Sequence, residues 1–119
     1  MLRVRTLMLI AATAAVLGVS APADAALPKI TGTVGPGFTI TTTRLAKKLV
    51  TLKAGTYSFT VVDKSNIHNY HLRGPGVNKE ITTVSFVGTK TVTITLKKGT
   101  YTFVCDPHAS TMKGSFKVT

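Results

Sequence analysis

The chain has 119 residues, a formal net charge of +11 and a single cysteine, so its length allows one small domain and excludes an internal disulfide. The excess of basic residues favours an acidic partner or an anionic envelope surface as the binding target. Alternatively, the charges simply form a solvated surface that keeps the protein soluble. Nucleic acid is excluded as a partner because the lysines are scattered and no basic run with interleaved aromatic residues occurs.

The first 25 residues have the features of a secretory signal peptide. Two arginines precede an apolar run at 7–19, and residues 23–25 read Ala-Asp-Ala, the small-x-small form of a cleavage site. The apolar run is shorter than the roughly 20 residues that a membrane-spanning helix needs. We therefore predict export to the extracellular space, periplasm or cell envelope, with residues 26–119 as a single domain. An uncleaved leader that serves as an anchor is the alternative.

Short strands separated by glycine turns are expected along the rest of the chain. In chain order, they are predicted at 30–34, 37–43, 49–62 with a turn at Gly55, 82–87, 91–96, 101–105 and 114–119. Residues 91–96 alternate threonine with aliphatic residues, which is the period of a half-buried strand. No stretch beyond the leader has a convincing helical period. The pattern therefore predicts an all-β domain, either a β-sandwich or a small barrel.

Two segments of the chain are similar to each other. VTLKAGTYSF at 50–59 and ITLKKGTYTF at 94–103 agree at seven of ten positions. A third copy is absent from the sequence, which argues against a solenoid. We interpret the two segments as similar hairpins within one sandwich.

The only cysteine, Cys105, is expected on the core side of its strand, at the last residue before Asp106 and Pro107. A free thiol there could be a small buried apolar group, but in an exported protein it invites oxidation and calls for an explanation. His108 and Met112 follow in the pattern Cys-x2-His-x3-Met. A thiolate, an imidazole and a thioether together suit copper rather than calcium or magnesium.

A trigonal copper site of this type needs a second histidine. The segment SNIHNYHLRGPG offers His68 and His71. It follows the first of the two similar segments as Cys105 follows the second, so both loops can lie at the same end of the sandwich. His71 would face away from His68 if 67–72 is extended, and it could replace His68, join it, or lie beside the site. A bulge near the loop would swap the two faces.

These features together resemble the cupredoxins, and among them the plastocyanin–amicyanin group. The resemblance covers most of 26–119 and rests on YTFVC before the ligand loop, CDPH within it, MKGSFKV after it, and the upstream His-Asn pair. It implies a Greek-key β-sandwich or small barrel of about seven or eight strands. It also implies one copper ion with the ligands His68, Cys105, His108 and Met112.

The resemblance also implies roles for neighbouring residues. Asn69 is expected to hydrogen-bond to the cysteine loop and hold it rigid. The spacing of three residues between His108 and Met112 lies between those of plastocyanins and amicyanins, so axial coordination by methionine stays open. His108 is the expected route for electrons, and Pro107 and Ala109 are the expected docking patch.

The function implied is that of a small exported type 1 (blue) copper protein, a monomer and not an enzyme, which passes one electron between redox partners. Three acidic residues remain beyond the leader, and two of them, Asp63 and Asp106, are explained as turn residues. The lysines would steer the protein toward a redox partner that is acidic at its docking surface. The alternative is an exported copper-handling protein that buffers or delivers the metal.

Overall fold

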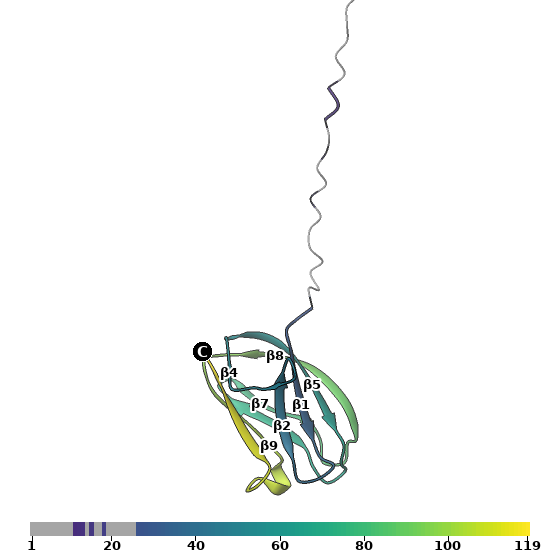
Figure 1. Cartoon of the computed structure of the whole chain (residues 1–119), viewed down its shortest axis with the longest axis vertical. Coiled ribbons are helices and arrows are strands. Elements are labelled where there is room, and N and C mark those ends of the chain that lie inside the picture. Colours follow the sequence, from purple (N-terminus) through teal and green to yellow (C-terminus); the bar gives the residue numbers. More distant parts are fainter. Residues whose placement is uncertain (1–10, 14, 16–17, 19–25) are drawn as a thin grey trace, which may run out of the picture.

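The computed structural model describes residues 11–13, 15, 18 and 26–119 (Figure 1). The signal peptide predicted at 1–25 therefore falls almost wholly outside the described residues. Residues 26–119 form two β-sheets that pack face to face, which confirms the all-β sandwich. Within the described part of the chain, helices long and apolar enough to cross a membrane are absent.

The domain contains ten strands and one short 3₁₀ helix. They are β1 (Lys29–Val34), β2 (Ile40–Arg44), β3 (Lys47–Lys48), β4 (Thr51–Leu52), β5 (Gly55–Asp63), β6 (Tyr70–Gly74), β7 (Val77–Thr82), β8 (Gly88–Leu96), β9 (Gly99–Val104), η1 (Asp106–His108) and β10 (Lys113–Val118). The count exceeds the predicted seven or eight because the sequence analysis missed three strands. β6 and all of β7 except Thr82 lie outside the predicted strands, and β3 has only two residues, too short to leave a period in the sequence.

Each sheet has five strands. The first has the order β3-β2-β1-β5-β8 and the second the order β4-β10-β9-β6-β7. Two pairs are parallel, β1 with β5 and β4 with β10, and the other pairs are antiparallel. The apolar side chains of both sheets point inward to one core, as the alternation in β5, β8 and β9 predicts.

The two similar segments are not hairpins, contrary to our interpretation of the sequence. β4 belongs to the second sheet and β5 to the first, whereas β8 belongs to the first and β9 to the second. Each segment therefore crosses the sandwich at its glycine. The alternation of residues correctly gives the buried face, but it carries no information about the partner strand. β4 pairs with β10, which lies more than 60 residues away in the chain.

Two predicted strand boundaries also differ from the structure. The strand expected at 82–87 is wrong: β7 ends at Thr82, and residues 83–87 form a turn in which the Phe86 amide donates to the Thr83 carbonyl (3.2 Å). β2 begins at Ile40 rather than at residue 37. At the other end of β2, Leu45 and Ala46 form a tight turn into β3, with φ values of 51° and 61°.

The loops that follow β1, β5 and β9 meet at one end of the sandwich. β1 and β5 run in parallel, so both deliver the chain to this end, and η1 lies there too (Figure 1). Residues 26–28 lead into β1 at the opposite end. We call these the loop end and the entry end of the domain.

Candidate metal centre

Three side chains from two distant segments converge at the loop end. His68 lies in the loop between β5 and β6, Cys105 follows β9 directly, and His108 closes η1. His68 and Cys105 are fully buried, and His108 is partly exposed. The sequence therefore identified three residues that the fold brings together.

The donor atoms of these side chains form a small triangle. Nδ1 of His68 lies 3.1 Å from Nδ1 of His108, and each nitrogen lies 3.6 Å from Sγ of Cys105. A point equidistant from the three atoms is about 2.0 Å from each, which is close to the bond lengths of transition metals to imidazole and thiolate, about 2.0–2.3 Å. The triangle is thus of the size that a metal ion fits.

The loop that carries Cys105 and His108 is closed by its own backbone hydrogen bonds. The Cys105 amide donates to the Met112 carbonyl (3.0 Å), and the Met112 amide donates to the His108 carbonyl (2.8 Å). The His108 amide donates to the Cys105 carbonyl (3.1 Å). Met112 is buried at the point where the loop enters β10. These bonds fix three of the four predicted ligands relative to one another.

Phe38 is a residue of the site that the sequence analysis missed. Its ring meets the rings of His68 and His108 edge to face, with centroids 5.3 and 4.9 Å apart. The side chain is 62% exposed, so it covers the two imidazoles from the solvent side. Phe38 comes from the loop between β1 and β2, and a lone aromatic residue in a glycine-rich loop gives no signal of this contact.

Asn69 joins the two loops that carry the ligands. Its Oδ1 accepts a hydrogen bond from the Asp106 amide (2.7 Å), and its Nδ2 donates to Asp106 Oδ2 (2.8 Å) and to Glu80 Oε2 (3.2 Å). Asn69 is buried. The upstream histidine is therefore followed directly by a residue that is bonded to the backbone just after the cysteine.

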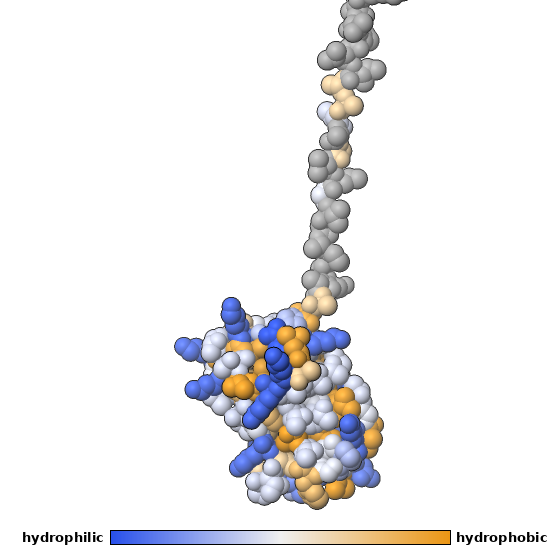
Figure 2. Space-filling model, viewed as in Figure 1, coloured by the Kyte–Doolittle hydropathy of each residue, from blue (hydrophilic) through white to orange (hydrophobic). Residues whose placement is uncertain are grey.

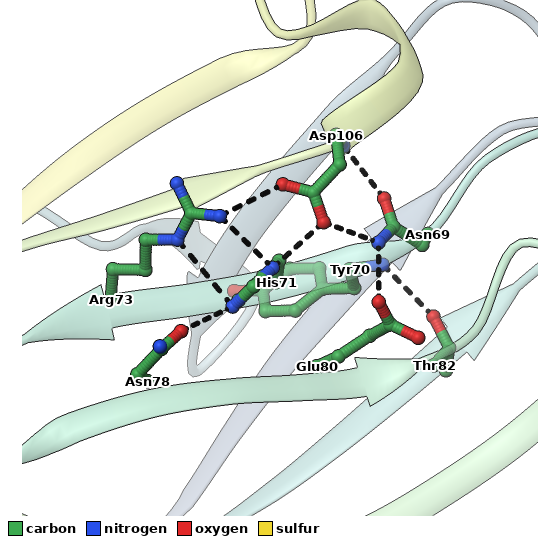
Figure 3. A network of polar contacts seen from close by, with 8 residues as sticks. All are labelled: Asn69, Tyr70, His71, Arg73, Asn78, Glu80, Thr82 and Asp106. Carbon is green, nitrogen blue, oxygen red and sulfur yellow. Dashed lines mark hydrogen bonds and ion pairs between the residues drawn. The ribbon is translucent and has the colours of Figure 1, made fainter.

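His71 lies outside the triangle, in a polar network on the neighbouring surface (Figure 3). Its Nδ1 is 2.7 Å from Asp106 Oδ2, and its Nε2 is 2.6 Å from Asn78 Oδ1. Both ring nitrogens are thus engaged away from Cys105. The pairing of β6 with β7 shifts register between Tyr70 and His71, so the irregularity weighed in the sequence analysis is present beside this histidine.

Asp106 is the centre of that network. Burial alone would raise the pKa of its carboxyl group. Hydrogen bonds from Asn69 and His71, together with the charges of His71 and Arg73, outweigh burial and hold the pKa below its usual value. The Arg73 guanidinium lies 3.2 Å from Asp106 Oδ1. The loop beside Cys105 is therefore anchored by a carboxylate that stays ionised at neutral pH.

The chemistry of the donor set fits copper. Two imidazole nitrogens and a sulfur atom face one another in a buried place. Water cannot hydrogen-bond to these atoms there, so their lone pairs need another partner. A metal ion accepts all three lone pairs at once. Two histidines, a cysteine and a buried methionine are the donor set of trigonal blue-copper sites.

Comparison with known proteins agrees with this donor set. Residues 34–119 match a family described as copper binding proteins, plastocyanin/azurin family. Among curated proteins, none matches the chain.

Solved structures of rusticyanin have a similar fold. One, described as a copper protein, is 21% identical over 76% of each chain, with a TM-score of 0.56. Another, rusticyanin from Thiobacillus ferrooxidans, is 26% identical over 76% of each chain, with a TM-score of 0.53.

Proposed function

The chain belongs to the plastocyanin/azurin family of copper-binding proteins, and we propose that it is an exported carrier of single electrons between redox partners. The observation that carries the proposal is the triangle formed by His68 Nδ1, Cys105 Sγ and His108 Nδ1. We assign these three residues as the groups that would hold copper, with Met112 as a fourth, weaker ligand. Copper, when bound, supplies a centre that exchanges one electron.

The residues around the triangle favour fast electron exchange because they hold the ligands in place. The backbone bonds of the 105–112 loop and the side chain of Asn69 fix the donor atoms before any metal enters. Ligands held in this way need little rearrangement when the charge of the site changes. The burial of His68, Cys105 and Met112 would keep most water away from a bound ion.

The partner would approach at His108. It is the one ligand of the triangle that is partly exposed, and Pro107 and Ala109 beside it are exposed. Phe38 adds a large apolar surface next to the same ring. An apolar patch around the exposed ligand suits a transient complex, because it needs no exact pairing of charges. We propose that a redox protein docks here.

Three further assignments belong to this proposal. Residues 1–25 direct export and are removed, which leaves 26–119 as the working domain. The protein acts as a monomer. It catalyses no reaction of its own, in keeping with its family, whose members are generally electron carriers rather than enzymes.

The visible absorption spectrum of the copper-loaded protein tests the assignment of the ligands. We expect an intense blue thiolate-to-copper band that bleaches on reduction, returns on oxidation and disappears in Cys105→Ala. His68→Ala should also abolish the band, whereas the matched variant His71→Ala should keep it. Loss of the band in His71→Ala with its retention in His68→Ala would reverse our choice of upstream ligand.

A second measurement separates electron transfer from copper handling. A carrier should show a reversible one-electron potentiometric titration and should lose copper slowly to a chelator, because the ligands are buried. Rapid transfer of copper to the chelator, without a reversible redox wave, would favour a protein that buffers or delivers the metal.

A further inference from the structure

The positive charge of the domain is concentrated at the entry end, far from the metal centre. Eight of the 13 basic residues of 26–119 lie there: Lys29, Arg44, Lys47, Lys48, Lys53, Lys97, Lys98 and Lys117. They come from the start of β1 and from the connections β2–β3, β4–β5 and β8–β9, with Lys117 at the end of β10. Several strongly hydrophilic side chains project around this end in Figure 2.

The acidic residues lie in the other half of the domain. Asp63 ends β5 at the loop end, Asp106 follows Cys105, and Glu80 contacts Asn69. These are the three acidic residues of 26–119. The entry end is therefore purely basic, and the domain has a strong charge asymmetry along its long direction.

Charges at the entry end are too far away to guide a partner to His108, so the steering expected of the lysines would have to come from the five basic residues outside this end. The nine residues of β8 run from the loop end to the entry end, which is about 30 Å at the rise of a strand. The Debye length in physiological salt is about 8 Å. The field of these lysines is screened before it reaches the loop end. The basic end therefore contributes little to recognition at His108, and its charge is available to a different binding partner.

Apolar side chains project from the same basic surface. Leu45, at the tip of the β2–β3 turn, is 85% exposed, and Val50 is 63% exposed. Arg44, Lys47 and Lys48 flank them and line the same shallow hollow. Exposed apolar groups surrounded by cations match the boundary between anionic headgroups and acyl chains.

Residues 26–28, which connect to the leader, enter the domain at this end, where the Ser58 amide donates to the Pro28 carbonyl (3.0 Å).

We propose that the entry end binds the surface of an anionic phospholipid bilayer, with Leu45 at the lipid boundary and the metal centre facing away. The partner surface is recognised by its phosphate charges and by the apolar layer beneath them. In this orientation His108 and Phe38 stay free for redox partners while the protein remains at the envelope. The inference rests on the proposed export but not on the presence of copper.

Vesicle binding tests the charge. The protein is taken as recovered after export and mixed with vesicles of phosphatidylglycerol and phosphatidylcholine, or of phosphatidylcholine alone. Binding is expected only to the mixed vesicles and should fall with salt. Each lysine near an anionic surface contributes about fivefold to binding. The triple variant Lys47→Gln, Lys48→Gln and Lys98→Gln should therefore lower the partition coefficient between vesicles and water roughly 100-fold. A matched variant of the loop end, Lys64→Gln, Lys90→Gln and Lys113→Gln, should change it far less.

Equal losses in the two triple variants would overturn the proposal, because net charge alone would then explain the binding. Failure of the parent protein to bind the mixed vesicles would overturn it as well. In that case, the protein can also be applied to a column of acidic polypeptide. Retention of the parent protein but not of the entry-end variant would mean that the partner is an acidic protein instead. None of these outcomes depends on the blue band, so the proposed function is judged separately.

A tryptophan reporter tests the orientation. The chain contains no tryptophan, so a single introduced one reports on its own surroundings. Leu45→Trp should show a blue-shifted emission on mixed vesicles, whereas Val87→Trp should not. Val87 is 59% exposed in the turn before β8 at the loop end. A shift of the second reporter without the first would mean that the loop end faces the bilayer, which contradicts the proposal.

Discussion

Asn69 and Asp106 are joined by two hydrogen bonds that tie the upstream histidine loop to the cysteine loop. The amide of Asp106 donates to Asn69 Oδ1 (2.7 Å), and Asn69 Nδ2 donates to the carboxylate of the same aspartate (2.8 Å). Asn69 is buried and Asp106 is about one-third exposed. One buried amide thus sets the relative position of two segments that are 37 residues apart in the chain.

Replacement of Asn69 by alanine should loosen both loops. The variant loses the bonds to Asp106 and the bond to Glu80, and the free energy of unfolding of the copper-free protein should fall by about 2 kcal/mol. Urea unfolding measures this change, and the rate of copper loss to a chelator should rise in parallel. Asn66→Ala, in the exposed part of the same loop, is the control and should change stability by less than about 0.5 kcal/mol.

Tyr70 should make the domain sensitive to alkali. Burial raises the pKa of its hydroxyl well above the usual value, although the hydrogen bond to Thr42 (2.6 Å) lowers it in part. The pKa of tyrosine in the unfolded chain is about 10. Below that pH the Tyr70 hydroxyl keeps its proton in the folded and in the unfolded state, so the full stability is present. Above it the unfolded chain releases the proton while the folded domain keeps it, so stability falls as pH rises.

The predicted slope of this loss is about 1.4 kcal/mol for each pH unit. Urea unfolding of the parent protein and of Tyr70→Phe between about pH 9 and 11 measures it. The variant should be less stable by about 1 kcal/mol at neutral pH, because the buried Thr42 hydroxyl loses its partner. The difference between the two proteins should shrink as pH rises. A constant difference across this range would contradict the prediction.

Gly114 is expected to tolerate no side chain. A Cβ at this position would overlap the ring of Phe103, which is stacked on Tyr70 with centroids 5.9 Å apart and cannot move freely. Gly114→Ala should therefore lower the free energy of unfolding by about 2 kcal/mol. Gly37→Ala is the matched control, because a Cβ there meets no atom within 4 Å. Thermal or urea unfolding that shows equal effects in the two variants would speak against the packing argument.

The turn between β2 and β3 should offer a stabilising substitution. Leu45 and Ala46 both have positive φ, the conformation of a type I′ turn, which favours Asn-Gly. Leucine and alanine are unfavourable in a left-handed conformation, whereas asparagine and glycine tolerate it. The double variant Leu45→Asn, Ala46→Gly should therefore raise the free energy of unfolding by about 1 kcal/mol. Ala54→Gly, at a position without positive φ, should give no such gain. Urea midpoints of the two variants provide the comparison.

The fold was predictable from the sequence where burial alone determines the pattern. The alternation in β8 and β9 gave the buried faces of both strands correctly, because side chains of a strand alternate between core and surface. The segment 82–87 was not predictable in this way. Threonine, valine and phenylalanine favour strands locally, yet residues 83–87 turn the chain between β7 and β8. Pairing partners are set by the whole sandwich and leave no local signal.

The site shows the same division. Cys105, His108 and Met112 share one loop, so their spacing alone indicated a metal site. The choice between His68 and His71 depends on how the loop before β6 places His68 against Cys105, which no local pattern reveals. The contacts of Asp106 with His71 and Arg73 join separate elements through exposed side chains, and Phe38 reaches the histidines from a third loop. Such contacts become visible only when the loops are placed together.

Phe38 should slow the loss of copper. Its ring lies over both imidazoles and shields them from solvent, although most of the side chain is exposed. Phe38→Ala should accelerate the transfer of copper to a chelator several-fold, while the blue band remains and the free energy of unfolding changes by less than about 1 kcal/mol. Ile67→Ala is the control: Ile67 is 49% exposed in the loop that carries His68. Equal rates of copper loss in the two variants would mean that apolar cover of the loop end in general, rather than the aromatic contact with the histidines, limits access to the metal.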